Sequence, residues 1–178
     1  QRLRRAMELH PGLSAKKAKH LLKNSKKLII LKAFTKLYGM AGVRLGYCLC
    51  SDTELLARMR AAGQPWAVSS LAQAAGIAAL DETEYVAKVR ALIEAQRPVL
   101  ADGLRALGLR VIEGRANYLL FRAPEALGEA LRRKGAVLRS CGNYPGLDAS
   151  WYRTAVRTEN ENRQLLALLA ETLPEVAQ

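Results

Sequence analysis

The hydrophobic pattern of the first fifty residues predicts helices followed by two strands. Residues 2–10 have helical composition, and a second helix is predicted from residue 14, a cap residue, to residue 24. The unbroken apolar run at residues 28–31 favours a strand buried on both faces of a parallel sheet over an amphipathic helix. A second apolar strand is predicted to end at Cys50.

The middle of the chain has the spacing of amphipathic helices. Asp52 is a cap residue for a helix that is predicted to end near Gly63. The acidic residues 81–84 favour the first turn of another helix, because negative charge is stabilised there by the helix dipole. Pro98 is predicted to kink or end that helix, so we place a hinge between two domains there.

The last third of the chain alternates between short strands and helices. The pattern predicts strands at residues 109–112, 118–121, 136–138 and 151–156, and helices at residues 124–134 and 160–169. This alternation is typical of a small α+β domain.

The composition describes a globular chain without a membrane segment. Half of the 178 residues are hydrophobic, which argues against disorder throughout the chain. No apolar run approaches the length of a membrane span, and the basic N-terminal stretch has no apolar signal-peptide core. We therefore expect a cytoplasmic protein that does not bind membranes.

The three cysteines do not predict a disulfide framework or a metal site. Cys48, Cys50 and Cys141 are odd in number and lie in apolar or strand-like surroundings. Cys-x-Cys without a nearby histidine is a poor zinc signal, because a tetrahedral site needs four ligands. We expect no metal.

The formal net charge of +12 is concentrated near the N-terminus, where residues 1–34 hold ten Lys or Arg and one acid, Glu8. Such a cluster could bind nucleic acid or an anionic surface. It could also be the exposed face of a helix before the first strand. No aromatic residues alternate with the basic ones, which favours the second interpretation. A basic nucleic-acid-binding module remains the alternative from another functional class.

A polar segment with candidate chemistry follows the first predicted strand. Lys36 comes at the carboxyl end of that strand, where open α/β sheets bind ligands, and Arg44 follows eight residues later across a glycine-rich loop. A lysine that is partly desolvated and near a second cation loses proton affinity, and its neutral amine can attack an aldehyde. The arginine offers a planar fork of donors for a phosphate. The expected ligand is an aldehyde that carries a phosphate.

Residues 33–47, A-F-T-K-L-Y-G-M-A-G-V-R-L-G-Y, closely resemble the cofactor-lysine segment of fold-type I pyridoxal phosphate enzymes. The similar branch holds histidinol-phosphate aminotransferases and threonine-phosphate decarboxylases. The resemblance implies that Lys36 forms the Schiff base with pyridoxal 5'-phosphate and that Thr35 and Arg44 bind the cofactor phosphate. Ala33 stands where the family usually has Ser or Thr, so we expect one phosphate hydrogen bond to be missing or replaced by water.

The same resemblance implies a substrate site in the last third of the chain. Arg153, in W-Y-R-T-A-V, matches the family's arginine for the substrate α-carboxylate. Arg139, in V-L-R-S-C-G-N-Y-P-G-L, matches a second arginine that faces the substrate phosphate, and Asn117 matches a family asparagine whose role stays open.

The resemblance covers roughly residues 28–170, the C-terminal half of a family member. It implies an α/β fold, the C-terminal part of a fold-type I transferase, with a remnant of the large, mainly parallel-sheet domain and a small α+β domain. We divide the chain into a basic helical segment at residues 1–27, the large-domain remnant at residues 28–98 and the small domain at residues 99–178. The family's acid for the pyridine nitrogen and its glycine-rich phosphate cup have no counterpart in this sequence. We therefore expect a truncated chain that binds the cofactor weakly and is inactive alone.

Two activities fit this resemblance. The segments around Arg139 and Arg153 look more like threonine-phosphate decarboxylases of cobalamin biosynthesis, and histidinol-phosphate aminotransferase of histidine biosynthesis is the alternative. Both act on a small phosphorylated amino substrate, and the cofactor supplies the electron sink. Residues 64–75 resemble the family helix that enters the dimer region, so we expect a homodimer of the full-length enzyme.

Overall fold

The computed structural model describes residues 15–176 and divides the chain into two compact units, unit 1 at Gln1–Val89 and unit 2 at Arg90–Gln178. The helix predicted at residues 2–10 and the cap at Ser14 lie outside the described residues. The boundary between the units falls within helix α5 (Thr83–Ala106), which also contains the predicted hinge. The predicted segments 1–27, 28–98 and 99–178 stay a prediction.

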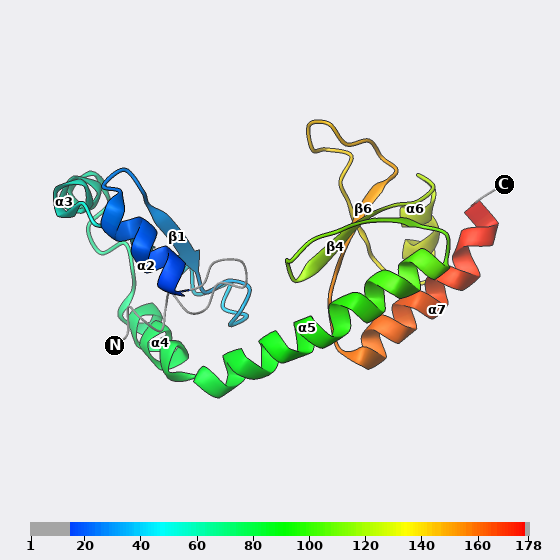
Figure 1. The fold of residues 1–178 in the computed structure, drawn as a ribbon, viewed down its shortest axis with the longest axis horizontal. Coiled ribbons are helices and arrows are strands. Elements are labelled where there is room, and N and C mark those ends of the chain that lie inside the picture. Colours follow the sequence, from blue (N-terminus) through cyan, green and yellow to red (C-terminus); the bar gives the residue numbers. More distant parts are fainter. Residues whose placement is uncertain (1–14, 177–178) are drawn as a thin grey trace. The chain divides into compact units, whose positions relative to one another are not determined.

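Unit 1 holds a two-stranded antiparallel ribbon and short helices (Figure 1). In chain order these elements are α2 (Ala15–Asn24), β1 (Ile30–Ala33), β2 (Gly46–Leu49), α3 (Thr53–Ala62) and α4 (Ser70–Asp81). The predicted Asp52 cap is confirmed, because its side chain accepts a hydrogen bond from the backbone N–H of Leu55 at 2.9 Å. The predicted end of α3 at Gly63 is confirmed too.

The first strand differs from its prediction in position and burial. β1 begins at Ile30, two residues after the predicted start, and pairs antiparallel with β2. Its side chains alternate between half-buried and exposed, and Leu31 is 75% exposed. The prediction of burial on both faces in a parallel sheet is wrong for the described residues. An apolar run does not say how many faces are covered, and a two-stranded ribbon needs cover on one face only.

Helix α4 packs on the end of this ribbon through a glycine. Ser69 caps the helix, and Ala72, Gly76 and Ala79 form its buried side. A Cβ atom at Gly76 would overlap the side chain of Leu45, so only glycine allows this close approach. These small residues thus bring α4 against the segment that precedes β2.

Helix α5 continues through Pro98, so the predicted end of the helix there is wrong, and the kink stays a prediction. The proline ring removes one backbone donor and normally costs helix stability. The next turns, however, bury Leu100 and Leu104 completely in the core of unit 2. This packing keeps the segment helical to Ala106, and Gly108, at φ 77°, lies just beyond the end.

Unit 2 is a four-stranded antiparallel sheet covered on one face by helices (Figure 1). The strand order is β3 (Arg110–Ile112), β4 (Tyr118–Arg122), β6 (Trp151–Ala155) and β5 (Arg139–Ser140). Helices α6 (Leu127–Arg133) and α7 (Glu159–Val176) join α5 over the core. The alternation predicted for the last third is confirmed, but the strand expected at residues 136–138 is found at Arg139–Ser140 as β5, three residues after its predicted start, because Leu138 lies in the core.

The strands of unit 2 alternate between the core and an uncovered surface. Leu119 and Phe121 of β4 and Tyr152 of β6 face the helices. Their neighbours face the other way, on a surface that we call the open face: Tyr118, Leu120, Arg122, Trp151 and Arg153. Within residues 15–176, no helix has both the length and the apolar character needed to cross a membrane.

Candidate functional site

The predicted cofactor lysine lies on a tight turn directly after β1, at residues 35–39, which we call the lysine turn. The N–H of Gly39 donates to the carbonyl of Lys36 at 3.3 Å, and the N–H of Met40 donates to that of Phe34 at 3.3 Å. Gly39 has a φ of 64°, a conformation that glycine adopts without a steric cost. The side chain of Lys36 is exposed. The expectation that it is partly desolvated is therefore wrong for the described residues.

An aromatic row packs beside the lysine turn. The ring of Phe34, which is 3% exposed, lies 5.3 Å from the ring of Tyr38 and 5.7 Å from that of Tyr47, between centroids. The ring of Tyr85, on α5, stacks on Tyr38 at 6.3 Å, and its hydroxyl donates to the carbonyl of Leu37 at 2.9 Å. Burial raises the pKa of Tyr47 to about 12, and the neighbouring Tyr38 adds to this shift. The row holds the backbone of the turn and leaves the lysine side chain outside.

Arg44 reaches the same end of the ribbon as Lys36. The N–H of Phe34 donates to the carbonyl of Leu45 at 3.2 Å, which continues the β1–β2 ladder beyond its last pair and brings the two segments together. Arg44 has a φ of 55°, a left-handed conformation that is uncommon outside glycine and concentrates at functional sites. Among the described residues, its guanidinium donates to the carbonyl of Ala41 alone, at 3.4 Å. In the described part of the chain, neither Lys36 nor Arg44 has a carboxylate partner.

Thr35 completes a set of donors that fits a phosphate-bearing aldehyde. Its side chain is half-buried and makes no hydrogen bond to another described residue. An amine, a guanidinium and a hydroxyl therefore lie within one short segment with no paired acid to repel an anion. Ala33, the residue that departs from the family pattern, ends β1 and offers only a methyl group.

The two predicted substrate arginines are direct cross-strand partners in unit 2. Arg139 of β5 pairs with Arg153 of β6, so both side chains leave the sheet on the open face. Residues 15–176 supply no carboxylate partner to either guanidinium. Two like charges that face each other across a ladder are destabilising unless something else compensates them. This arrangement can bind a ligand with two anionic groups.

Aromatic rings lie under both guanidinium groups. The Cζ atom of Arg153 is 4.6 Å from the ring centroid of Tyr118, and the Cζ atom of Arg139 is 5.9 Å from that of Tyr144. Arg139 also donates to the side-chain carbonyl of Asn143 at 3.4 Å. Sequence reasoning missed both tyrosines. A signal for Tyr118 existed, because it stands two positions from Leu120 on a predicted strand and so shares its face.

Asn117 lies at the start of β4, with an exposed side chain that makes no hydrogen bond to a described residue. Its carbonyl accepts from the N–H of Val156 at 2.9 Å, which fixes the backbone at this position. The preceding loop is held from α5, where Arg97 donates to the carbonyls of Arg115 at 3.0 Å and Ala116 at 3.5 Å. The structure thus orders the backbone of Asn117 and leaves its amide available.

The predicted site residues form two groups, one in each unit: Lys36, Thr35 and Arg44 in unit 1, and Arg139, Arg153 and Asn117 in unit 2. A hollow of about 520 Å³ lies elsewhere, between α5, β3 and the loop after β3. None of the predicted site residues lines it.

Comparisons with known proteins match most of this chain. The model of the family "Aminotransferase class I and II" matches residues 7–169. The threonine-phosphate decarboxylase of Salmonella typhimurium is 38% identical over 160 residues, which are 88% of this chain and 44% of that protein. The chain thus spans less than half the length of this curated relative.

Solved structures share the fold. The histidinol-phosphate aminotransferase from Clostridium acetobutylicum aligns with a TM-score of 0.87 and 30% identity, over 95% of this chain and 52% of that one. The histidinol-phosphate aminotransferase from Sinorhizobium meliloti, solved in complex with pyridoxal-5'-phosphate, aligns with a TM-score of 0.66 and 25% identity, over 85% and 41%. These alignments confirm the predicted α/β fold class.

Proposed function

Because the chain belongs to the aminotransferase class I and II family, a family of pyridoxal phosphate-dependent enzymes, we propose that it supplies the cofactor lysine and the substrate-binding arginines of such an enzyme. The observation that carries this proposal is the pair Arg139 and Arg153, which face each other on adjacent strands without an acid partner among the described residues. Two uncompensated cations side by side are costly in a protein that does not bind a dianion.

Unit 1 holds the cofactor in this proposal. Lys36 supplies the amine that attaches pyridoxal phosphate, and Arg44 and Thr35 bind its phosphate. When bound, this cofactor supplies the electron sink for negative charge that develops on the substrate's α-carbon. Lys36 Nζ, once free, is the group that returns a proton to that carbon. Weak cofactor binding by this chain alone, expected from the sequence, stays a prediction.

Unit 2 binds the substrate. Arg153 takes the α-carboxylate with the two donors on one edge of its guanidinium, and Arg139 takes the phosphate. Asn117, whose amide is free, is a further donor beside Tyr118 at the start of β4. The substrate is therefore a small phosphorylated amino acid.

Among the two activities, we favour a threonine-phosphate decarboxylase that serves cobalamin biosynthesis. O-phosphothreonine carries both a carboxylate and a phosphate, and so satisfies both arginines at once. Histidinol phosphate carries a phosphate but no carboxylate and leaves one of them unpaired. A dicarboxylate amino-group acceptor would also satisfy both arginines, so the product of the reaction has to decide between the activities.

The substrate class is tested by titrating the chain, labelled with ¹⁵N, with three ligands. O-phosphothreonine has both anionic groups, threonine has the carboxylate alone, and phosphoethanolamine has the phosphate alone. We expect O-phosphothreonine to bind tightest, with shifts at Arg139 and Arg153. Equal affinity for O-phosphothreonine and phosphoethanolamine would contradict the proposal that the site binds a carboxylate and a phosphate together.

The reaction type is tested with pyridoxal phosphate added to a longer enzyme that includes this chain, because the chain alone is expected to be inactive. Release of CO₂ from O-phosphothreonine is the expected outcome. Formation of glutamate from histidinol phosphate and 2-oxoglutarate, in which the amino group passes from the donor to the 2-oxo acid, is not expected, because the proposal assigns decarboxylation and not transamination. Loss of the amino group from histidinol phosphate with 2-oxoglutarate present, without CO₂ release from O-phosphothreonine, would establish the aminotransferase alternative.

The partner and the location in the cell complete the proposal. Unit 1 exposes large apolar side chains on and before α4, with Trp66 97% exposed and Leu71 84% exposed, and a second copy of the chain would cover such side chains. Light scattering should give the mass of a dimer, and Leu71→Asp should lower it. A monomer at every concentration would contradict the dimer. A cytoplasmic location is tested by fractionating cells with an antibody against the chain.

A further inference from the structure

Arg153 is held over an aromatic ring and not by an acid. Its guanidinium carbon lies 4.6 Å from the ring centroid of Tyr118, inside the range of a cation–π contact. Tyr118 of β4 pairs with Ala155 of β6, two residues along from Arg153, so the ring and the guanidinium are diagonal neighbours on the open face. The side chains directly opposite Arg153 are Leu120 and Arg139, and neither can accept a hydrogen bond from it.

Another arginine on the same face, Arg122, is held in the usual way, by a polar side chain and an acid. Arg122 donates from Nε to the hydroxyl of Ser150 at 2.8 Å, and its terminal nitrogen lies 3.7 Å from a carboxylate oxygen of Asp148. One donor of that guanidinium is thus used by a hydroxyl, and the nearby carboxylate of Asp148 compensates its charge. Arg122 and Arg153 differ in what holds them, although they lie on neighbouring strands of one sheet.

An acid partner and an aromatic partner leave different parts of a guanidinium available to a ligand. An acid binds the in-plane N–H donors, which are the same donors that a ligand's carboxylate would use. A ring attracts the flat face of the guanidinium and leaves the in-plane donors free. The ring also resists the repulsion from Arg139 directly opposite.

We propose that Tyr118 is a positioning residue, which fixes the guanidinium of Arg153 through its ring so that the N–H edge stays open for a substrate carboxylate. The inference rests on the proposed function for the assignment of Arg153 to that carboxylate. Tyr144 plays the corresponding part for Arg139 more weakly, because its ring centroid is 5.9 Å from that guanidinium carbon and Asn143 supplies a second contact.

The test uses the whole 178-residue chain and two substitutions at Tyr118, an exposed strand position. Tyr118→Phe keeps the ring and Tyr118→Val removes it while keeping a residue that favours strands. The first readout is the NMR signal of the Arg153 Nε–H group, which a ring beneath it moves upfield. The signal should keep its position in Tyr118→Phe and move downfield in Tyr118→Val. If Tyr118→Val does not fold, Tyr118→Leu replaces it.

The second readout separates positioning from general damage. Tyr118→Val should weaken binding of O-phosphothreonine roughly two- to fivefold, the change expected when a cation–π contact at an exposed site is lost. Binding of phosphoethanolamine, which has no carboxylate, should not change. Tyr118→Phe should bind O-phosphothreonine as tightly as the wild type. Tyr144→Val is the matched control, with the smaller effect expected at Arg139.

Each outcome decides one point. Equal affinity for O-phosphothreonine in wild type and Tyr118→Val, with the NMR shift lost, overturns the role of Tyr118 and leaves the proposed function intact. Equal weakening for both ligands also overturns it, because a merely structural role would act on both. If Arg153→Ala binds O-phosphothreonine as tightly as the wild type, the proposed function of Arg153 is wrong, and the role of Tyr118 is wrong with it.

Discussion

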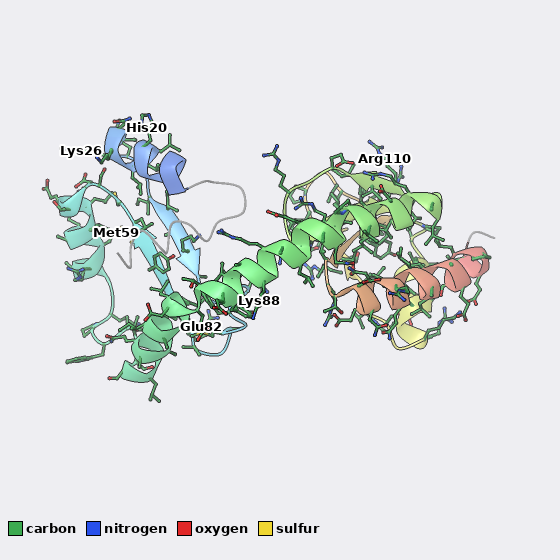
Figure 2. The ribbon with its side chains drawn as sticks, turned by 60° about the horizontal axis from the view of Figure 1, so that its bottom comes forward. His20, Lys26, Met59, Glu82, Lys88 and Arg110 are labelled. Carbon is green, nitrogen blue, oxygen red and sulfur yellow. The ribbon has the colours of Figure 1, made fainter. Side chains whose placement is uncertain are left out.

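The two units support their site residues in different ways. In unit 2, leucines from three helices are completely buried against β4 and β6, and the substrate arginines lie on strands of that sheet. In the described part of unit 1 the largest buried side chain is Phe34, and no residue of α3 is buried; Met59 on this helix, labelled in Figure 2, is 40% exposed. The proposed substrate residues thus lie on a packed framework, and the proposed cofactor residues lie on a turn held by a few aromatic contacts.

The two groups of site residues therefore differ in how firmly the backbone that carries them is packed. Lys36 depends on the row of Phe34, Tyr38, Tyr47 and Tyr85, because these rings fix the backbone on either side of it. Cofactor binding adds stability to a folded state that has the site, so it should stiffen unit 1 more than unit 2.

Phe34→Ala should remove the structure of unit 1 and leave unit 2 folded. Loss of a buried phenylalanine costs roughly 3–5 kcal/mol, which is comparable with the whole stability of a small unit. Hydrogen exchange should become fast for β1 and β2 and stay slow for β4 and β6. The matched substitution Phe121→Ala should act on the β4 and β6 amides instead, and equal loosening of both units by Phe34→Ala would contradict the contrast.

Arg44→Ala and Arg44→Gly should both weaken pyridoxal phosphate binding by roughly 2–5 kcal/mol, the loss expected for a charged partner. They should differ in stability, because glycine relieves a left-handed conformation that costs other residues roughly 1–2 kcal/mol. Cofactor titration and denaturant unfolding separate the two effects. Arg153→Ala is the control and should leave cofactor binding unchanged. Cofactor affinity that Arg44→Ala does not alter would count against the phosphate assignment.

Tyr47 should make unit 1 sensitive to alkali. Burial raises the pKa of Tyr47 to about 12, above the value of 10.0 in an exposed tyrosine. A raised folded pKa means that the stabilising contribution is complete below pH 10 and is lost as the pH rises through 12. Absorbance of the phenolate should show a late-titrating component, which Tyr47→Phe reduces. A titration in which all tyrosines ionise together near pH 10 would show that Tyr47 is not buried.

Lys134 should give unit 2 a smaller alkaline effect. Its amine donates to Glu171 at 2.8 Å and to Glu175 at 2.7 Å, and these hydrogen bonds raise the pKa of Lys134. The ion pairs between α6 and α7 are therefore present at neutral pH and are lost only when the pH passes the raised pKa. Lys134→Met should lower the melting temperature of unit 2 slightly at pH 7 and not above that pKa. A pH-independent difference would argue for lost packing instead.

Sequence patterns predicted the elements of unit 2 well because their signals are local. Alternation at residues 151–156 places β6, and the proline and glycine positions place α6 and the end of α5. The sequence pattern gave wrong predictions where contacts with residues far along the chain determine the local structure. The run at residues 28–31 carries no sign of which faces are covered, and the core contacts of Leu100 and Leu104 keep α5 helical through Pro98.

The candidate site divides in the same way. A contiguous motif identifies Lys36, Thr35 and Arg44 as candidates, because the residues lie within one turn and one loop. The pairing of Arg139 with Arg153, and the ring of Tyr118 beneath the latter, depend on strand register. Register comes from pairing between distant segments, so single residues on one strand do not reveal their cross-strand neighbours.

The most direct test of the central claim is which lysine of this chain pyridoxal phosphate attaches to. The protein is incubated with a small excess of the cofactor, reduced with borohydride, digested, and its peptides are mapped by mass spectrometry. We predict that the pyridoxyl label lies on Lys36 and that Arg44→Ala reduces it, because the phosphate then loses its partner. A label spread over the other exposed lysines, with no preference for Lys36, would contradict the assignment of this turn as the cofactor site.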